Sequence, residues 1–275
     1  LVQRQGFTGA AEGDCVRGKR QVREGTLDTG KHEIDAEVKS WVVDINGMKV
    51  LIDTGAGNHE ARPVIPLFGQ LETPFIERLA AAGFAPEDID MVICTHLHVD
   101  HVGWNTKLEG DAWVPAFPRA RYIFSAADAE YWNPENRSKF PEKIGEAVNE
   151  GFFDDSVRPI LERGMAELVS GRAEVAPGIV LDPAPGHTPG SMTITVAGRD
   201  DSAVFVGDIL HHPLQVLQPQ WSSIFCEDQG QARVTRRAVL SRVADMGAVM
   251  IPAHFAGEHM VRVTRADEGF GIAEI

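Results

Sequence analysis

The pattern of hydrophobic and polar positions changes near residue 37. The preceding residues are polar, glycine-rich and charged without a steady period, which predicts an irregular N-terminal arm over 1–36 that could pack on a partner subunit. The pattern then becomes that of β-structure, with hydrophobic runs at 38–45 and 48–52 on either side of Asn46-Gly47. An Asn-Gly pair between two such runs predicts a tight hairpin.

Helical spacing recurs at 73–82, with Thr73 as the expected N-cap, at 126–132, and at 229–246 with Gly247 as the stop. On the last of these helices an apolar face is expected to hold Val234, Ala238, Val243 and Met246. Residues 133–172 lack the strand rhythm and predict a helical insertion that includes a helix over 156–169. Such an insertion would be a lid, a substrate wall or simply a peripheral cap.

Short hydrophobic runs elsewhere predict the remaining strands. They lie at 90–94, 113–117, 121–124, 174–175, 179–181, 192–196, 203–206 and 249–251. The rough β-then-α rhythm in both halves predicts an α/β (α+β) protein with two sheets and helices outside them. We expect a single domain over 37–275.

Composition narrows the function classes. The chain has 275 residues, is 43% hydrophobic and carries a net charge of −14, which permits a large core and argues against nucleic-acid binding. No window resembles a membrane span. Cys15, Cys94 and Cys226 include no close pair, so a reducing, cytoplasmic location is expected. The group Arg233, Arg236 and Arg237 is interpreted as a solvated helix face rather than an anion site.

The stretch Thr95-His96-Leu97-His98-Val99-Asp100-His101 holds the candidate chemistry. Alternate side chains of an extended backbone share a side, so His96 and His98 should point together. A turn after them would bring Asp100 and His101 to a second point nearby. Imidazole and carboxylate are the ligands of zinc-class ions, so one loop predicts two metal positions. Cys94 is interpreted as a small buried side chain rather than a ligand.

Three further residues of ligand type stand beside strand ends. His187 lies in a Pro- and Gly-rich loop, Asp208 follows the run at 203–206, and His254 follows the run at 249–251. Taken singly, a capping Asp or a core His would be the default interpretation. Together with the first loop they complete a set: His96, His98 and His187 on one ion, Asp100, His101 and His254 on the other, and Asp208 between them. Such a set leaves each ion open for water or substrate, as in catalytic sites.

Asp53 ends the hydrophobic run at 48–52 and begins an acidic, glycine-rich turn. Two interpretations remain open for it. The carboxylate could orient a metal ligand, or it could cap backbone amides in an Asx turn.

These motifs resemble the metallo-β-lactamase superfamily, whose His-x-His-x-Asp-His signature stands at 96–101. The 51–55 turn, the His187 loop, Val206-Gly207-Asp208 and His254 follow in the family's order. The resemblance implies a four-layer αβ/βα sandwich with the metals at one edge between the sheets, and the seven residues above as ligands with Asp208 bridging. Asp208 stands where zinc β-lactamases carry a cysteine, which favours the glyoxalase II, lactonase and organophosphate hydrolase branches. Two divalent ions are expected, Zn²⁺ first, with Mn²⁺, Fe²⁺ or Co²⁺ as alternatives.

The predicted function is hydrolysis of a small, fairly apolar carboxylic ester or lactone by a hydroxide held between two metal ions. Asp100 and Asp208 are the expected catalytic residues, and His211 is a candidate donor to the substrate or a plain loop histidine. Quorum-sensing lactonases place a tyrosine soon after the bridging Asp, whereas Ile209-Leu210-His211-His212 here is more similar to the branch containing methyl parathion hydrolase. Trp104, Trp132, Phe152, Phe153, Trp221 and Phe225 would line the substrate or simply form core.

Three alternatives to this function remain. The same site could hydrolyse an organophosphate triester, or it could be the iron centre of an oxidoreductase of the sulfur dioxygenase type. The chain could also be a noncatalytic binding protein. The expected partner is a small-molecule substrate, with no nucleic acid, no membrane and a possible homodimer.

Overall fold

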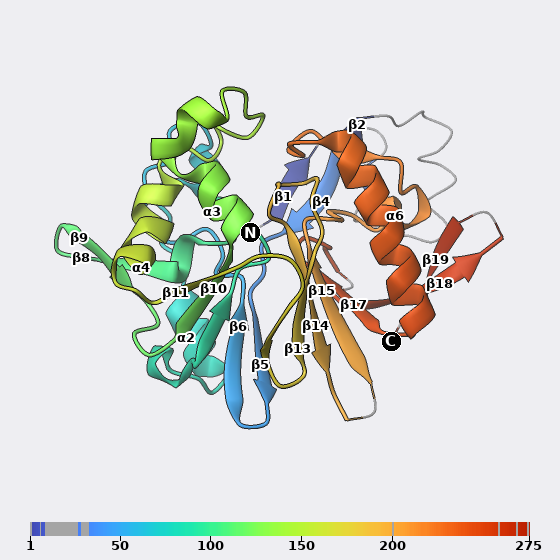
Figure 1. The fold of residues 1–275 in the computed structure, drawn as a ribbon, viewed down its shortest axis with the longest axis horizontal. Coiled ribbons are helices and arrows are strands. Elements are labelled where there is room, and N and C mark those ends of the chain that lie inside the picture. The colour runs from blue at the N-terminus through green and yellow to red at the C-terminus, as the bar shows by residue number, and fades with distance from the viewer. Residues whose placement is uncertain are drawn as a thin grey trace. The chain divides into compact units, whose positions relative to one another are not determined.

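The structure of the protein is a computed structural model (Figure 1). It describes residues 2–5, 7–8, 27–28, 33–199, 201–257, 259–267, 269–273 and 275, so Cys15 and most of the predicted arm lie outside the described residues. The chain divides into two compact units: a central unit, 39–170, and a terminal unit that combines the residues up to 38 with 171–275. The expected single domain over 37–275 stays a prediction.

The central unit is built on a five-stranded sheet in the order β11-β10-β7-β6-β5. Its strands are β5 (Trp41–Ile45), β6 (Met48–Ile52), β7 (Met91–Ile93), β10 (Arg121–Ser125) and β11 (Ala166–Val169). β6, β7, β10 and β11 are parallel neighbours. Inner strands of such a sheet are covered on both faces, which is why β7 is a continuous buried hydrophobic run.

The predicted hairpin is confirmed, although β5 begins at Trp41 rather than at residue 38. Asn46 and Gly47 both have positive φ, 53° and 83°, as the favoured two-residue hairpin turn requires. The other elements of the unit are α2 (Phe75–Ala81), α3 (Ala126–Trp132), α4 (Arg158–Glu162), the 3₁₀ helices η1 (Pro66–Phe68), η2 (Pro86–Asp88), η3 (Gly103–Asn105) and η4 (Pro134–Lys139), the π-helix η5 (Phe153–Val157), and the hairpin of β8 (Thr106–Glu109) and β9 (Ala112–Pro115).

Two predictions in this unit need correction. Thr73 does not cap α2, which begins at Phe75, because its amide and hydroxyl both donate to Asn58 Oδ1 instead. The predicted helix over 156–169 ends at Glu162, and Gly164 with a φ of 66° turns the chain into β11. β11 pairs with β10, so the last part of the supposed helical insertion belongs to the sheet. Ala166, Glu167 and Leu168 all have high helix propensity, so the local sequence favours a helix over a strand here.

The terminal unit holds a seven-stranded sheet in the order β12-β13-β14-β15-β17-β18-β19. Its strands are β12 (Ala173–Ala176), β13 (Ile179–Pro183), β14 (Met192–Ala197), β15 (Ser202–Gly207), β17 (Val249–Pro252), β18 (Val261–Ala266) and β19 (Gly269–Ala273). The first five were predicted, and the closing hairpin of β18 and β19 was not. The helices of this unit are α5 (Leu214–Leu217) and α6 (Gln229–Met246).

The residues before 38 were expected to be irregular, yet the described part of them forms strands. β1 (Val2–Gln5), β3 (Leu27–Asp28) and β4 (Glu33–Glu37) make a three-stranded sheet, and β2 (Phe7–Thr8) pairs with β16 (Ser222–Ser223). An isolated bridge joins Ala36 to Phe255, so β4 is tied to the segment that follows β17.

α6 has the predicted bounds, but of the residues predicted on its apolar face only Val243 is buried. Asp228 caps its start by accepting from the Gln231 amide at 2.8 Å, and Gly247, with a φ of 63°, ends it. Val234 and Met246, expected on the apolar face, are exposed. The buried residues are Ala232, Thr235, Arg236, Val239, Leu240 and Val243. The interpretation of Arg236 as solvated is therefore wrong. Because this charged residue lies on the buried face of the helix, the apolar face predicted from the hydrophobic residues was misplaced.

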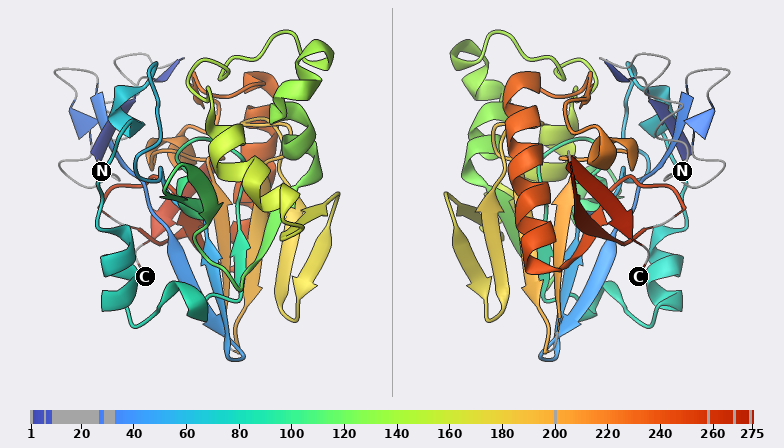
Figure 2. Two further views of the ribbon diagram at one scale, coloured as in Figure 1. Left: turned by 90° about the vertical axis from the view of Figure 1, so that its left-hand side faces the viewer. Right: turned by 90° about the vertical axis from the view of Figure 1, so that its right-hand side faces the viewer.

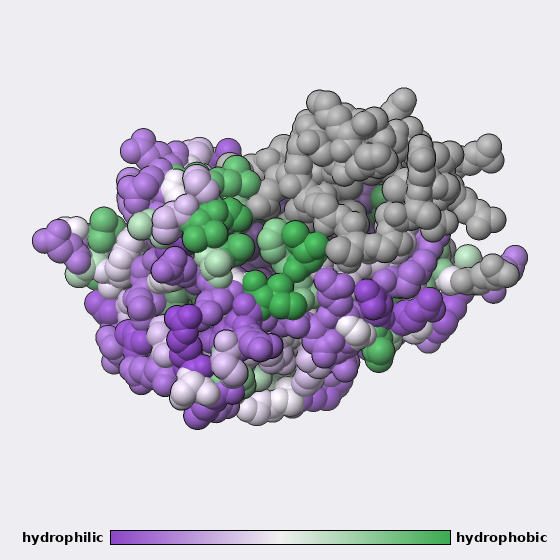
Figure 3. All heavy atoms as spheres, turned by 90° about the horizontal axis from the view of Figure 1, so that it is seen from above, coloured by the Kyte–Doolittle hydropathy of each residue, from purple (hydrophilic) through white to green (hydrophobic). Residues whose placement is uncertain are grey.

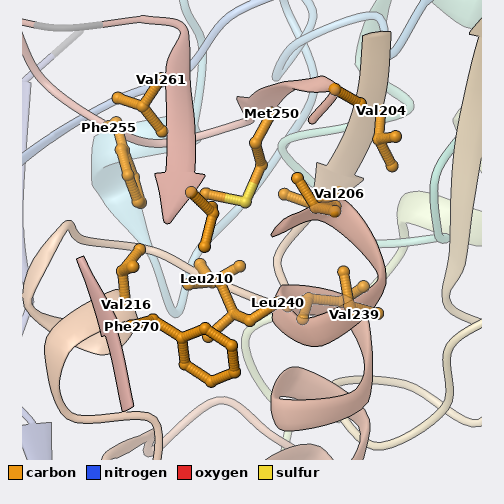
Figure 4. Packing of buried hydrophobic residues seen from close by; sticks show 14 of the residues in the cluster. Val204, Val206, Leu210, Val216, Val239, Leu240, Met250, Phe255, Val261 and Phe270 are labelled. Atoms are coloured by element: carbon orange, nitrogen blue, oxygen red, sulfur yellow. The ribbon is translucent and has the colours of Figure 1, made fainter. Parts of the chain in front are cut away.

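α6 covers one face of the seven-stranded sheet (Figure 2). Its Val239, Leu240 and Val243 join β15, β17, β18 and β19 in one hydrophobic cluster (Figure 4). Leu210, fully buried in the same cluster, anchors the turn that follows Asp208. Where Figure 3 colours the residues, most of them are hydrophilic, with a few hydrophobic patches. None of the helices in the described ranges has both the length and the apolar run needed to cross a bilayer.

Candidate metal centre

The His-rich loop leaves the sheet at the end of β7, and its ligand-type side chains gather as predicted. The ring centroids of His96 and His98 are 4.6 Å apart, and those of His96 and His101 are 4.1 Å apart. His101 Nε2 lies 3.7 Å from Asp100 Oδ1. All four residues are buried, at 9% exposure or less. The central unit therefore brings together a set of three imidazoles and a carboxylate, which we call the central set.

Asp53 holds this loop from the neighbouring strand. Its Oδ1 accepts from the Thr95 amide at 2.7 Å, and its Oδ2 lies 3.0 Å from His101 Nδ1. Asp53 therefore orients an imidazole, as one interpretation had it, whereas the backbone amide that it binds belongs to Thr95, 42 residues along the chain, and not to an Asx turn. The Thr95 hydroxyl in turn lies 3.2 Å from His96 Nδ1. Cys94 is fully buried, as expected, and burial raises the pKa of its thiol well above the usual value.

Two further side chains hold the backbone of the loop, and sequence reasoning missed both. Asp128 of α3 accepts from the Leu97 amide at 2.9 Å, and Asn149 accepts from the Val99 amide at 2.9 Å. The loop also passes so close to another turn that a Cβ on Gly103 would lie 2.1 Å from the Ala56 carbonyl carbon. Neighbours on three separate segments, namely the turn after β6, α3 and the stretch around Asn149, therefore fix the loop before any metal binds.

In the terminal unit three histidines surround Asp208, which follows β15. Asp208 Oδ1 lies 2.9 Å from His254 Nε2, and its Oδ2 lies 3.2 Å from both His187 Nε2 and His211 Nε2. We call His187, Asp208 and His254 the terminal set. The stack of His211 on His254, with centroids 5.5 Å apart, places the candidate substrate donor directly beside it.

The outer nitrogens of the terminal histidines are also held. His254 Nδ1 lies 2.7 Å from the Glu37 carbonyl oxygen, and His187 Nδ1 lies 3.7 Å from Cys226 Sγ. Sequence reasoning missed both partners. The carbonyl has no signal in side-chain chemistry, and Cys226 stands alone in the sequence.

The pKa values of two histidines beside Asp208 shift in opposite directions. Burial lowers the pKa of His187, but the Asp208 carboxylate outweighs it and raises this pKa to about 10. Burial lowers the pKa of His211 to about 4, and Asp208 opposes this shift while His187 and His254 add to it. His211 is therefore a neutral imidazole at physiological pH.

Both sets suit a divalent cation of the zinc class. In His96, His101, His187 and His254 the Nδ1 atom has a protein partner, which leaves Nε2 as the atom that each ring offers to a cation. This is the usual arrangement for histidines that bind metals. His187, Asp208 and His211 also offer ligand atoms that all lie within 4.8 Å of one another.

The sequence of the chain matches the metallo-beta-lactamase superfamily over residues 35–254. The chain belongs to this superfamily. Its match includes every residue of the central and terminal sets. The predicted family and the mixed α/β fold class are confirmed.

Relatives in the superfamily are enzymes. An N-acyl homoserine lactonase from a Bacillus species is 26% identical over 206 residues, which are 70% of this chain and 71% of that protein. The structure of the hydrolase AbOPH has a TM-score of 0.79 at 23% identity and covers 100% of this chain and 93% of its own. AidC, a dizinc quorum-quenching lactonase in complex with the product N-hexanoyl-L-homoserine, has a TM-score of 0.72 at 21% identity, covering 89% and 81%. The prediction of a hydrolase of this superfamily is confirmed at that level.

Proposed function

We propose that the chain is a metal-dependent hydrolase of small, fairly apolar carboxylic esters or lactones. The central and terminal sets would together hold two divalent cations, Zn²⁺ first, with Asp208 between them. The observation that carries the proposal is the pair of buried sets in which four of the five imidazoles already have a protein partner at Nδ1. The lactonases among the relatives support an ester or lactone bond.

The number of donors supports a shared site. A catalytic zinc takes about three protein ligands and leaves one position open, so two ions need about six, or slightly fewer if one carboxylate bridges. The central set has four donors and the terminal set has three. Neither set supplies two ions alone, whereas together they supply three ligands to each ion and a bridging carboxylate.

When bound, two such ions would activate water and polarise the carbonyl oxygen of the substrate. The residues of the chain would do the rest. Asp100, 3.7 Å from His101, could hold the proton of the attacking water and return it to the leaving oxygen. His211, a neutral imidazole that stacks on His254, could donate a hydrogen bond to the substrate. Burial of both sets would exclude bulk water from the reaction.

A cavity of about 520 Å³ in the central unit supports a substrate with an apolar part. Trp132, Phe152 and Phe153 form the aromatic part of its lining, beside Asn149 and charged residues that include Arg137, Lys143 and Glu146. Two of the lining residues, Trp132 and Asn149, also touch the metal-binding loop. The Trp132 ring meets the His98 ring edge-on at 5.3 Å, and Asn149 holds the Val99 amide. We therefore place the acyl part of the substrate against Trp132 and Phe152, which corresponds to the predicted substrate wall.

Phosphotriester hydrolysis is the second candidate. The segment after Asp208 carries His211 and His212 where quorum-sensing lactonases are expected to carry a tyrosine, and this favours the organophosphate hydrolase branch. Both reactions would use the same ligands and differ in the shape of the substrate.

The test is an assay of metal-stripped and zinc-reloaded protein on lactone, aryl ester and phosphotriester substrates. We expect reloading to restore hydrolysis, with a lactone or ester as the best substrate. The Asp208→Ala variant should lose nearly all activity. The control is Asp245→Ala, which removes an exposed carboxylate that pairs with Arg265 and should lose no activity. Full activity of Asp208→Ala would overturn the proposal, and one iron per chain without zinc would move the function to an oxidoreductase.

A further inference from the structure

A charged side chain lies in the core of the terminal unit, on the buried face of α6. Arg236 has no exposed surface, and its neighbours on this face of the helix include Val239, Leu240 and Val243. Among the residues that the structure describes, no carboxylate pairs with it. Burial lowers the pKa of Arg236 to about 10, so the guanidinium remains charged at physiological pH.

Backbone carbonyls take the place of a counterion. Arg236 Nε donates to the Ile209 oxygen at 2.7 Å, and its Nη1 donates to the oxygens of Pro219 and Trp221 at 2.9 and 2.7 Å. Ile209 directly follows Asp208, while Pro219 and Trp221 lie at the far end of the same loop. One side chain thus ties both ends of the 209–221 loop to α6.

Gln215 continues this network to His211. Its Nε2 donates to the Trp221 oxygen at 3.1 Å, the same oxygen that Arg236 binds. Its Oε1 accepts from the amides of His211 and His212 at 2.6 and 3.3 Å. Hydrogen bonds therefore run without a break from Arg236 through Trp221 and Gln215 to the backbone of His211.

We propose that Arg236 is a positioning residue. By tying the 209–221 loop to α6, it holds Asp208 and His211 in place for metal and substrate binding. The inference rests on the proposed function and deepens it. An isolated buried charge costs several kcal/mol, and apolar side chains often fill such positions with equal or better stability. The three carbonyl contacts all reach the 209–221 loop, which contains His211 and directly follows Asp208. They give this charge a role that core packing alone would not need.

The test compares Arg236→Met and Arg236→Lys with Arg237→Met, the exposed neighbour on α6. Hydrogen exchange is followed residue by residue in the metal-free protein, and zinc affinity is measured by chelator competition. In Arg236→Met we expect the His211 and His212 amides to exchange at least about tenfold faster while amides of β15 and β17 keep their rates. Zinc affinity should fall about 10- to 100-fold, the usual loss when a residue that orients metal ligands is removed.

Arg236→Lys keeps the charge but offers a single donor atom, so we expect intermediate changes, and this variant decides the matter if Arg236→Met does not fold. Arg237→Met should match the wild type. Wild-type exchange and zinc affinity in the Arg236 variants would overturn the inference. Equal acceleration of exchange in β15, β17 and the loop would also overturn it, because that result describes a purely structural residue. A wild-type protein that binds zinc but hydrolyses no ester would defeat the proposed function instead.

Discussion

The chemistry of each candidate ligand depends on what touches its other polar atom. His101 shows this most clearly, because Asp53 Oδ2 lies 3.0 Å from its Nδ1 and thereby fixes the ring and leaves Nε2 for a cation. Three other rings have a partner at Nδ1 as well. The Glu37 carbonyl lies beside His254, the Cys226 thiol beside His187 and the Thr95 hydroxyl beside His96. The carboxylate is the strongest of these acceptors, so we expect its removal to have the largest effect.

Replacing Asp53 with Ala should therefore weaken zinc binding by about 10- to 100-fold, because His101 loses its orienting carboxylate and Thr95 loses its acceptor. Competition with a coloured chelator would measure the change. Asp44→Ala, in the exposed part of the β5–β6 hairpin, is the control and should bind zinc like the wild type. Unchanged affinity in Asp53→Ala would contradict the orienting role.

Glu60 should make stability depend on pH. Burial, with Asp155 nearby and against Arg62, raises the pKa of Glu60 from 4.5 to about 8. Between these values the unfolded chain has lost the Glu60 proton that the folded chain keeps, so the contribution of Glu60 to the free energy of unfolding falls as pH rises and levels off above about pH 8. The total loss should be a few kcal/mol.

Glu60→Gln keeps the neutral form and should remove this slope, so that the variant is more stable than the wild type at pH 8 and the gap closes toward pH 4.5. Urea unfolding across this range is the measurement. Glu77→Gln, on the exposed side of α2, should leave the slope in place. A difference in stability between wild type and Glu60→Gln that stays constant from pH 4.5 to pH 8 would show that Glu60 ionises normally.

At this scale the sequence shows the candidate ligands but not their supports. His96, His98, Asp100 and His101 stand together in one motif, and His187, Asp208 and His254 follow strand ends. Asp128 and Asn149 could not be predicted, because they reach the loop from 31 and 50 residues away with no local pattern.

Individual elements were predictable where local signals were strong. The β5–β6 hairpin and the bounds of α6 follow from Asn46-Gly47 and Gly247, residues whose positive φ the structure confirms. The buried face of α6 and the strand β11 were not predictable. The buried face of α6 includes the charged Arg236, so hydrophobic periodicity does not mark it. β11 forms by pairing with β10, and the local pattern of a sequence does not show which strands pair.

The close approach of η3 to the turn at 55–57 should make Gly103 irreplaceable. A Cβ there would lie 2.1 Å from both the Ala56 carbonyl carbon and the Gly57 nitrogen. We expect Gly103→Ala to lower the free energy of unfolding by about 3 kcal/mol or more and to reduce metal binding. Gly269→Ala, where a Cβ meets nothing within 4 Å, is the control in the same thermal unfolding experiment. If Gly103→Ala had the stability and metal binding of the wild type, η3 and the turn at 55–57 would not be in the close contact described.

Trp132, at the end of α3, should control which acyl chains are accepted. Trp132→Ala should enlarge the cavity and shift the preference between short and long acyl chains by at least about tenfold in kcat/KM, with an unchanged number of bound ions. Trp113→Ala, in the β8–β9 hairpin, is the control. A loss of metal together with activity would assign Trp132 to support of His98 instead.

At the scale of the whole molecule, the candidate ligands are divided between the two units. The central set belongs to residues 39–170, and the terminal set belongs to 171–275, with Glu37 supporting His254 from the N-terminal side. The family match spans both units, which supports one function that requires both. The order of these residues along the chain was visible in the sequence, whereas their union at two ions and the possible homodimer stay predictions.

An anomalous-scattering map at the zinc edge, from crystals of the protein grown with zinc, tests the central claim most directly. We expect two peaks per chain, each about 2.0 to 2.2 Å from donor atoms of both the central and the terminal set, with Asp208 shared between them. A single peak held by one set alone, or no peak beside His96 and Asp208, would contradict it.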